Sequence, residues 1–211
     1  MKRFSPAAAI ATATASAATL MLSSLPAEAH GVAAGGAWGG LTHPLLGLDH
    51  LFMLMAVGTA ASFISARLLL WALGGAVIGA AVGLTGWSVP SAELLAALAV
   101  SVLGGVILLA GKASNGNTFK GNPLTTLSAS VVAVGVSLHA MLHGLEAPAD
   151  GSTVLWWGGA LLSSALVCGA TYLLLKKLPG VRPQAAAWAF LAIGGLLAWA
   201  PLAQSAAGAG A

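Results

Sequence analysis

The sequence predicts an all-α, polytopic membrane protein, and three observations support this: its composition, the length of its apolar segments and the placement of its charges. Hydrophobic residues make up 58% of the 211 positions, charged residues only 6%, and the mean hydropathy is +0.94. Soluble domains carry about 25% charged residues. The net charge of +3 comes from few residues, whereas a nucleic-acid-binding surface needs clustered Lys and Arg. We therefore expect contact with membrane lipid and none with nucleic acid.

Residues 1–29 have the pattern of a cleaved secretory signal. Two basic residues near the start precede a moderately apolar stretch, and Ala27-Glu28-Ala29 is a small-residue cleavage pattern. An uncleaved first anchor is the alternative, although the middle of the stretch is only weakly hydrophobic. Cleavage after this pattern makes His30 the first residue of the mature chain, where a terminal amine beside an imidazole can chelate a divalent metal. An exposed N-terminal histidine without such a role is the simpler interpretation.

Six apolar segments follow, and each has about the 20 residues needed to cross the hydrocarbon core. They cover approximately residues 44–65, 68–89, 92–111, 124–143, 153–175 and 184–202. Residues 30–42 are Gly-rich and loop-like, and Pro44 suits the first turn of a helix, where its missing N–H costs nothing. The second segment carries glycines at the four-residue spacing that lets transmembrane helices approach closely. We expect residues 30–211 to form a single six-helix transmembrane transport domain.

The charges predict the orientation of this domain. The basic residues beyond the signal fall in alternate loops: Arg67, Lys112, Lys120, Lys176, Lys177 and Arg182. By the positive-inside rule these loops face the cytoplasm. With six spans, the mature N-terminus and the C-terminus are then both outside. The acidic residues are expected toward the outer side: Asp49, Glu93, Glu146 and Asp150.

Two groups of polar residues interrupt the apolar segments on the expected outer side. The first, HPLLGLDH, contains His43, Asp49 and His50, and the second, HAMLHGLE, contains His139, His143 and Glu146. Unpaired polar groups in hydrocarbon cost several kcal/mol, so such residues are usually functional. In the second group the i, i+4 spacing lets one helical face offer two imidazoles to one ion. We expect the two groups to meet in space and to hold a metal ion.

The role of Asp49 depends on the local helix geometry. If a helix starts near Pro44, His43 and His50 project from nearly the same face, and Asp49 points about 100° away. Asp49 is then a ligand only in a wide site, or if Gly47 bends the first turn. Otherwise it orients a histidine by accepting a hydrogen bond from its other ring N–H.

Three further residues carry sulfur or a charge, and each is considered in turn as a metal ligand. Met53 offers a thioether one turn below His50, although packing is the simpler interpretation. Glu93 either supplies a further carboxylate or interacts favourably with the dipole at a helix start. The single cysteine, Cys168, excludes an internal disulfide and any CxxC metal site. Binding must therefore use nitrogen, oxygen and at most thioether.

These residues carry a resemblance to a known family. HPLLGLDHLFMLMAVG followed by HGLEAP resembles the HupE/UreJ family of membrane nickel permeases, and the secretory start and six-span layout extend the similarity over nearly the whole chain. The resemblance implies import of Ni²⁺, or in some relatives Co²⁺, across the bacterial inner membrane to supply hydrogenase, urease or cobalamin synthesis. It also implies the residues essential for transport and their partner motif, which are His43, Asp49 and His50, with His139, His143 and Glu146.

The sequence favours a secondary transporter over an enzyme. It lacks the ATP-binding motif GxxxxGK[ST], and a site without thiolate suits an ion that must be released. Ni²⁺ or Co²⁺ is then the transported substrate, and no cofactor is expected to be tightly bound. One alternative is a membrane-embedded zinc hydrolase, which uses similar ligands and one open metal position. Another is a haem held by two axial histidines. The metal, the energy coupling, the exit path and a homo-oligomeric state stay open.

Overall fold

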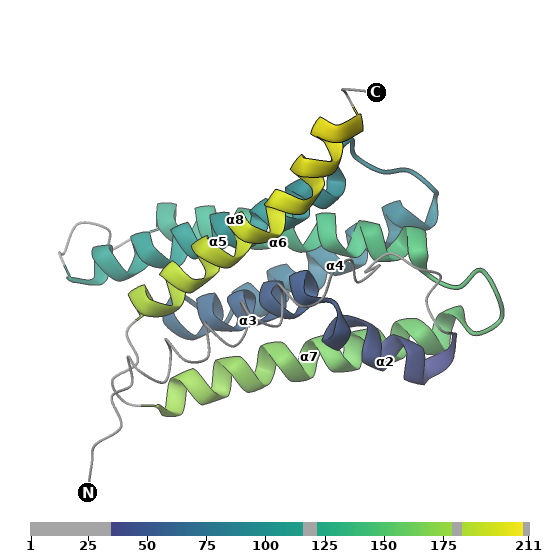
Figure 1. Cartoon of the computed structure of the whole chain (residues 1–211). Helices are drawn as coiled ribbons and strands as arrows, with labels where there is room; N and C mark the ends of the chain where they lie inside the picture. Colours follow the sequence, from purple (N-terminus) through teal and green to yellow (C-terminus); the bar gives the residue numbers. More distant parts are fainter. Residues whose placement is uncertain (1–34, 116–121, 179–182, 209–211) are drawn as a thin grey trace, which may run out of the picture. The chain divides into compact units, whose positions relative to one another are not determined.

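The helices of the protein follow the apolar segments of the sequence. A computed structural model describes residues 35–115, 122–178 and 183–208, and every regular element within these ranges is an α-helix. They are α2 (Gly36–Leu46), α3 (Leu48–Phe63), α4 (Leu68–Leu84), α5 (Ala92–Asn115), α6 (Asn122–Glu146), α7 (Thr153–Lys177) and α8 (Pro183–Gly208) (Figure 1). The predicted all-α class is thus confirmed. The predicted signal peptide and His30 lie outside the described residues.

The helices differ in whether each is long enough to cross a membrane. Three of those described are long and apolar enough: Ala92–Gly111 in α5, Thr125–Glu146 in α6 and Thr153–Lys177 in α7. The bent pair of α2 and α3 makes a fourth span if the two are counted together, and the apolar helices Leu68–Leu84 and Gln184–Trp199 are shorter. Length and composition in this part of the chain therefore support three or four spans. The count of six stays a prediction.

The first apolar segment differs from its prediction. α2 begins at Gly36, inside the stretch predicted as a loop, and Pro44 lies within this helix rather than in a first turn. The expectation of a loop over this stretch was therefore wrong for its second half. The break comes later, at Gly47, where the backbone is extended and α2 and α3 are bent by 77°. A single straight helix from Pro44 is replaced by two helices.

Close packing against α7 explains why a Gly-rich stretch becomes helical. A Cβ on Gly40 would collide with the backbone carbonyl of Trp156, and a Cβ on Gly159 would collide with that of Ala37. Glycine is a poor helix former in isolation. In a membrane protein, however, small residues let two helix backbones come together and gain van der Waals contact. Tertiary packing thus overrides the local propensity from which the loop was predicted.

The three glycines of α4 at four-residue spacing have the packing role that this spacing predicted. Each of the three lies against a carbonyl of α6, where a Cβ would collide; the pairs are Gly75 with Ala133, Gly79 with Ser137 and Gly83 with Met141. The residue numbers of the contacting pairs increase together along both helices, so α4 and α6 run in the same direction. The Ser137 hydroxyl also donates a hydrogen bond of 2.9 Å to the carbonyl of Gly75. The interface is close, and it is built from backbone.

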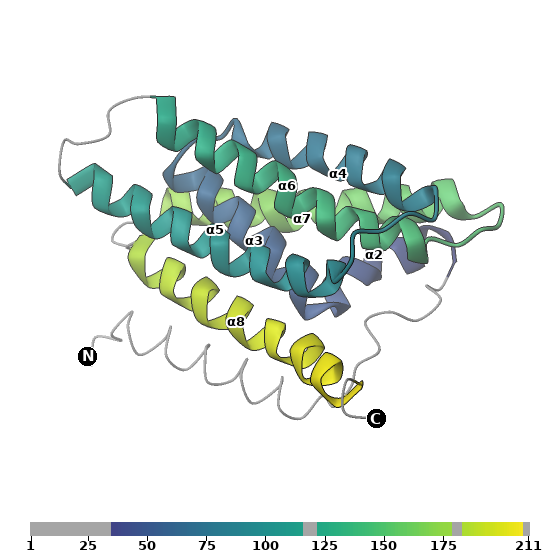
Figure 2. The same cartoon turned by 90° about the horizontal axis from the view of Figure 1, so that it is seen from above.

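α3 is the central helix of the described chain and contacts all six of the others (Figure 1 and Figure 2). Its small side chains allow this, because Ala56, Val57 and Ala60 are fully buried. A Cβ on Gly58 would meet the backbone of Cys168 on α7. Of the two polar residues in its first turn, His50 is buried, while Asp49 is partly exposed.

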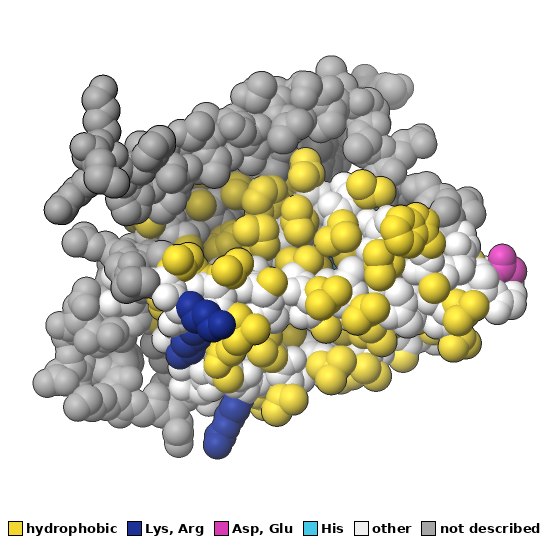
Figure 3. Space-filling model, turned by 90° about the horizontal axis from the view of Figure 1, so that it is seen from below, with side chains coloured by type: hydrophobic (Ala, Val, Ile, Leu, Met, Phe, Trp, Pro, Cys, Tyr) yellow, Lys and Arg dark blue, Asp and Glu magenta, His cyan; other side chains and the backbone are white. Residues whose placement is uncertain are grey.

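Basic and acidic residues lie at opposite ends of the helices. α3 and α7 run in the same direction, because Leu54 contacts Cys168 and Gly58 contacts Thr171. The start of α3 therefore lies beside the middle of α7, near Ser164, and Lys176 and Lys177 in the last turn of α7 lie toward the end of α3. Figure 3 shows Lys and Arg side chains at one end of the visible face and acidic side chains at the other. This separation agrees with the predicted orientation.

Candidate metal site

The break between α2 and α3 places the first polar group. His43 lies in the last turn of α2, and Asp49 and His50 lie at the start of α3. Because the helices are bent by 77°, the expected common face of one helix does not exist. The bend brings the histidines together by another route, and the ring centroids of His43 and His50 are 5.6 Å apart. Gly47 is suited to this break, since a Cβ there would collide with the ring of His50.

The second polar group, on α6, lies directly against the first. The ring of His50 lies between two histidines of α6, with centroid distances of 4.0 Å to His143 and 5.1 Å to His139. Nε2 of His43 lies 2.8 Å from Nδ1 of His143. The structure thus brings together four of the five histidines of the chain.

The carboxylates border this group from two sides. Oδ1 of Asp49 lies 2.8 Å from Nδ1 of His50, and its Oδ2 lies 3.6 Å from Nε2 of His139. Oε2 of Glu146 lies 3.5 Å from Nε2 of His43 and 3.9 Å from Nδ1 of His143. α6 stays helical through Gly144 to Glu146, which keeps this carboxylate near the histidines. Both acids therefore face the imidazoles.

The potential ligands form two overlapping sets. The outer set is His43, His50 and His143, and the inner set is Asp49, His50 and His139. In each set the ligand atoms lie within 4.8 Å of one another. Two nitrogens that bind one metal at about 2.0–2.1 Å can be at most about 4.2 Å apart. A small contraction of the side chains is therefore enough for either set to bind an ion.

The burial of the imidazoles points to a ligand. His50 and His139 are only 3% and 4% exposed. Within the part of the chain that the structure describes, none of their four ring nitrogens makes a hydrogen bond, although one lies close to Asp49. Buried polar atoms usually have a partner, and leaving one unsatisfied costs free energy. A metal ion would satisfy these nitrogens.

Tryptophan forms a wall of the site that the sequence did not predict. Trp156 is fully buried, and its ring centroid lies 5.2 Å from that of His43 and 6.2 Å from that of His143. Nothing in the sequence connected this residue to the histidines. The link depends on α2 packing against α7, which followed from no local pattern. Trp156 therefore borders the outer set on the side of α7.

The three further residues considered as ligands, Met53, Glu93 and Cys168, lie in different parts of the structure. Met53 is 2% exposed and, with His50, His139 and His143, lines a cavity of about 70 Å³ between α3, α6 and α7. Glu93 is exposed in the first turn of α5 and belongs to neither ligand set. Cys168 is buried and donates a hydrogen bond from Sγ to the carbonyl of Leu54, 3.3 Å away.

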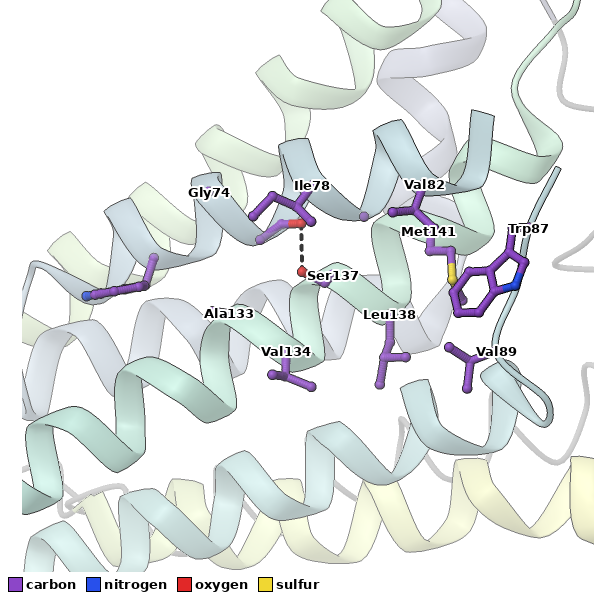
Figure 4. Close-up of a pocket in the computed structure, with 13 residues that line it drawn as sticks. Gly74, Ile78, Val82, Trp87, Val89, Ala133, Val134, Ser137, Leu138 and Met141 are labelled. Carbon is purple, nitrogen blue, oxygen red and sulfur yellow. Dashed lines mark hydrogen bonds between the residues drawn. The ribbon is translucent and has the colours of Figure 1, made fainter. Parts of the chain in front are cut away.

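A larger cavity lies away from the histidines. It occupies about 420 Å³ beside the interface of α4 and α6, and Figure 4 shows apolar side chains and glycine around it. Of the side chains around it, Ser137 offers a hydroxyl, which bonds to the carbonyl of Gly75, and Trp71 and Trp87 each offer an indole N–H. No histidine or carboxylate lines it. Three of the candidate histidines, His50, His139 and His143, line the smaller cavity instead.

Comparisons with known proteins agree with the motifs. The family model described as HupE / UreJ protein matches residues 18–204. Protein HupE of Rhizobium leguminosarum bv. viciae is 31% identical over 157 residues, which cover 71% of this chain and 76% of that protein. No solved structure gives a significant match. The match extends over all seven described helices and includes both polar groups.

Proposed function

Because the chain belongs to the HupE/UreJ family, we propose that this multi-pass membrane protein imports a divalent transition-metal ion across the bacterial inner membrane. The family is associated with nickel and cobalt transport. Ni²⁺ is the proposed substrate, and Co²⁺ is the alternative. The observation that carries the proposal is the meeting of four imidazoles and two carboxylates from α2, α3 and α6. Imported metal would then supply the maturation of nickel enzymes or the synthesis of cobalamin.

The proposed mechanism begins with capture at the outer end of the helices. The side chains of Asp49, His43, His143 and Glu146 are 13–20% exposed. An entering ion would therefore meet these groups before the more deeply buried rings of His50 and His139. Imidazole and carboxylate suit Ni²⁺ and Co²⁺, although Cu²⁺ and Zn²⁺ bind such ligands as well. Geometry and metal availability would then determine selectivity. Uptake would be passive or coupled to a gradient.

The size of the site supports transport over hydrolysis. A membrane-embedded zinc hydrolase would need room for its substrate beside the metal, and small-molecule sites typically occupy about 300–1,000 Å³. The cavity that touches the histidines has only about 70 Å³. This space suits an ion with a few water molecules, since water takes up about 30 Å³ each. The larger apolar cavity holds no histidine that could bind a haem.

Uptake of radiolabelled nickel into cells expressing the chain tests this function. We expect saturable uptake that His50→Ala removes while the variant remains in the membrane, and that Cys168→Ser leaves unchanged. Cobalt, zinc and copper as competitors would rank the substrates. Absence of uptake, with the protein present in the inner membrane fraction, would contradict the proposal.

A further inference from the structure

We propose that the histidine cluster offers a single ion two alternative positions, the outer set and the inner set, and that the ion moves between them while His50 stays bound. The inference deepens the proposed function and rests on it. It follows from the overlap of the two sets, which have His50 in common and no other residue.

The two positions lie at different depths along α6. His143 belongs to the outer set and His139 to the inner set, and four residues of helix separate their Cα atoms by about 6 Å along the axis. The two histidines of α6 follow the same order, since the side chain of His143 is 13% exposed and that of His139 is 6% exposed, whereas the carboxylate of Asp49 is 20% exposed. An ion that moves from the outer to the inner set therefore moves along α6 by about one helical turn, from His143 to His139.

The position of His50 allows it to serve both sets. Its ring centroid lies 4.0 Å from that of His143 and 5.1 Å from that of His139, so one imidazole is close to a histidine of each set. Each set contributes two further ligand atoms from other residues. An ion can thus exchange two ligands while it keeps one. It is then never without a protein ligand, which would be costly in a medium of low dielectric constant.

Charge distinguishes the two positions. The outer set consists of three imidazoles, with Glu146 beside two of them, whereas the inner set includes the carboxylate of Asp49 itself. A carboxylate attracts a dication more strongly than a neutral imidazole does, which favours the inward step. Two dications at positions so close together would repel strongly inside the protein. The cluster therefore holds one ion at a time.

The cavity of about 70 Å³ connects the two sets. It touches His143 of the outer set, His139 of the inner set and the shared His50. The space accommodates about two water molecules, which would complete the coordination of an ion held by three protein ligands. Met53 closes the cavity on the α3 side and is buried.

Binding of Co²⁺ to purified protein in lipid nanodiscs tests the two positions, because its absorption spectrum reports the ligands. The variants are His43→Gln in the outer set, His139→Gln in the inner set, their combination, and His50→Gln. Gln keeps much of the side-chain volume, and Cys168→Ser serves as the matched control. Size-exclusion chromatography shows that each variant is folded before binding is measured.

We expect one equivalent of Co²⁺ in the wild-type protein and in each single variant, His43→Gln of the outer set and His139→Gln of the inner set. Their spectra should differ from each other, because one retains a carboxylate ligand and the other an additional nitrogen. The combined variant and His50→Gln should each bind at least about tenfold more weakly than either single variant. Two equivalents in the wild type would overturn the single-ion proposal.

A single shared site gives a different result. In that case His43→Gln and His139→Gln each weaken binding about as much as His50→Gln does, and the combined variant binds more weakly still. This outcome would overturn the two positions and leave the proposed transport function standing. If the wild-type protein bound neither Co²⁺ nor Ni²⁺ at all, the proposed function itself would fail.

Discussion

Two faces of α6 show how different chemistry arises on one helix. The face toward α4 presents the backbone at Ala133, Ser137 and Met141, and glycines pack against it. The face toward α3 presents His139 and His143. The α4 side borders about 420 Å³ of space and the histidine side about 70 Å³. The larger cavity is therefore not the one beside the candidate ligands, which include the buried ring nitrogens of His50 and His139 without hydrogen bonds.

We expect the largest effect from substitution of His50, the histidine of α3 that faces His139 and His143 of α6. His50→Ala removes a ligand from both sets, so we expect nickel uptake to fall to background. The amount of protein in the membrane should stay close to that of the wild type, because the imidazole makes no hydrogen bond that the described fold depends on. Uptake assays normalised by immunoblotting measure this. Retained uptake would exclude His50 as a shared ligand.

Asp49→Asn keeps the size of the side chain and removes its charge. We expect uptake to fall about 10–100-fold, the range found when a partner of a metal ligand is removed. Asp150→Asn is the matched control, since Asp150 is an exposed acid in the loop between α6 and α7. Equal losses in both variants would indicate a general effect of surface charge on ion capture.

At the interface of α4 and α6, we expect substitutions to change the stability of the folded protein. Gly79→Val places a side chain against the carbonyl of Ser137, and we expect a loss of about 1–3 kcal/mol in the free energy of unfolding. Gly74→Val is the matched control, because a Cβ there meets no atom within 4 Å. Thermal unfolding in detergent compares the two. Equal stability of both variants would contradict the close contact of α4 with α6.

The smallest expected effect comes from the hydroxyl on the same face. Ser137→Ala removes the hydrogen bond to the carbonyl of Gly75, and bonds of this kind in membrane proteins contribute about 0.6 kcal/mol. Uptake per folded molecule should be unchanged, since the hydroxyl lies on the side of α6 away from the histidines. A large loss of uptake would connect the α4 face to transport.

These two faces also show what the sequence could predict. The spacing of Gly75, Gly79 and Gly83 predicted close packing, and that prediction is confirmed because it depends only on helical periodicity. The i, i+4 spacing of His139 and His143 likewise predicted one helical face. Such patterns are local, and a helix preserves them wherever it packs.

The rest of the site depends on packing between distant segments. The helix from Gly36 was missed because its stability comes from contact with α7, and the wall made by Trp156 was missed for the same reason. The bend at Gly47 was considered only as a condition under which Asp49 becomes a ligand. Nothing local distinguishes this glycine from the many that pack within helices.

The break at Gly47 also determines the backbone electrostatics of the cluster. α2 ends at Leu46 beside His43, and α6 ends at Glu146. The last carbonyls of a helix lack partners within it, and together they act as roughly half a negative charge. Two such negative helix ends lie beside His43 and Glu146, whereas the positive N-terminal end of α3 lies beside Asp49 and His50. The field of the backbone therefore differs between the outer and the inner set.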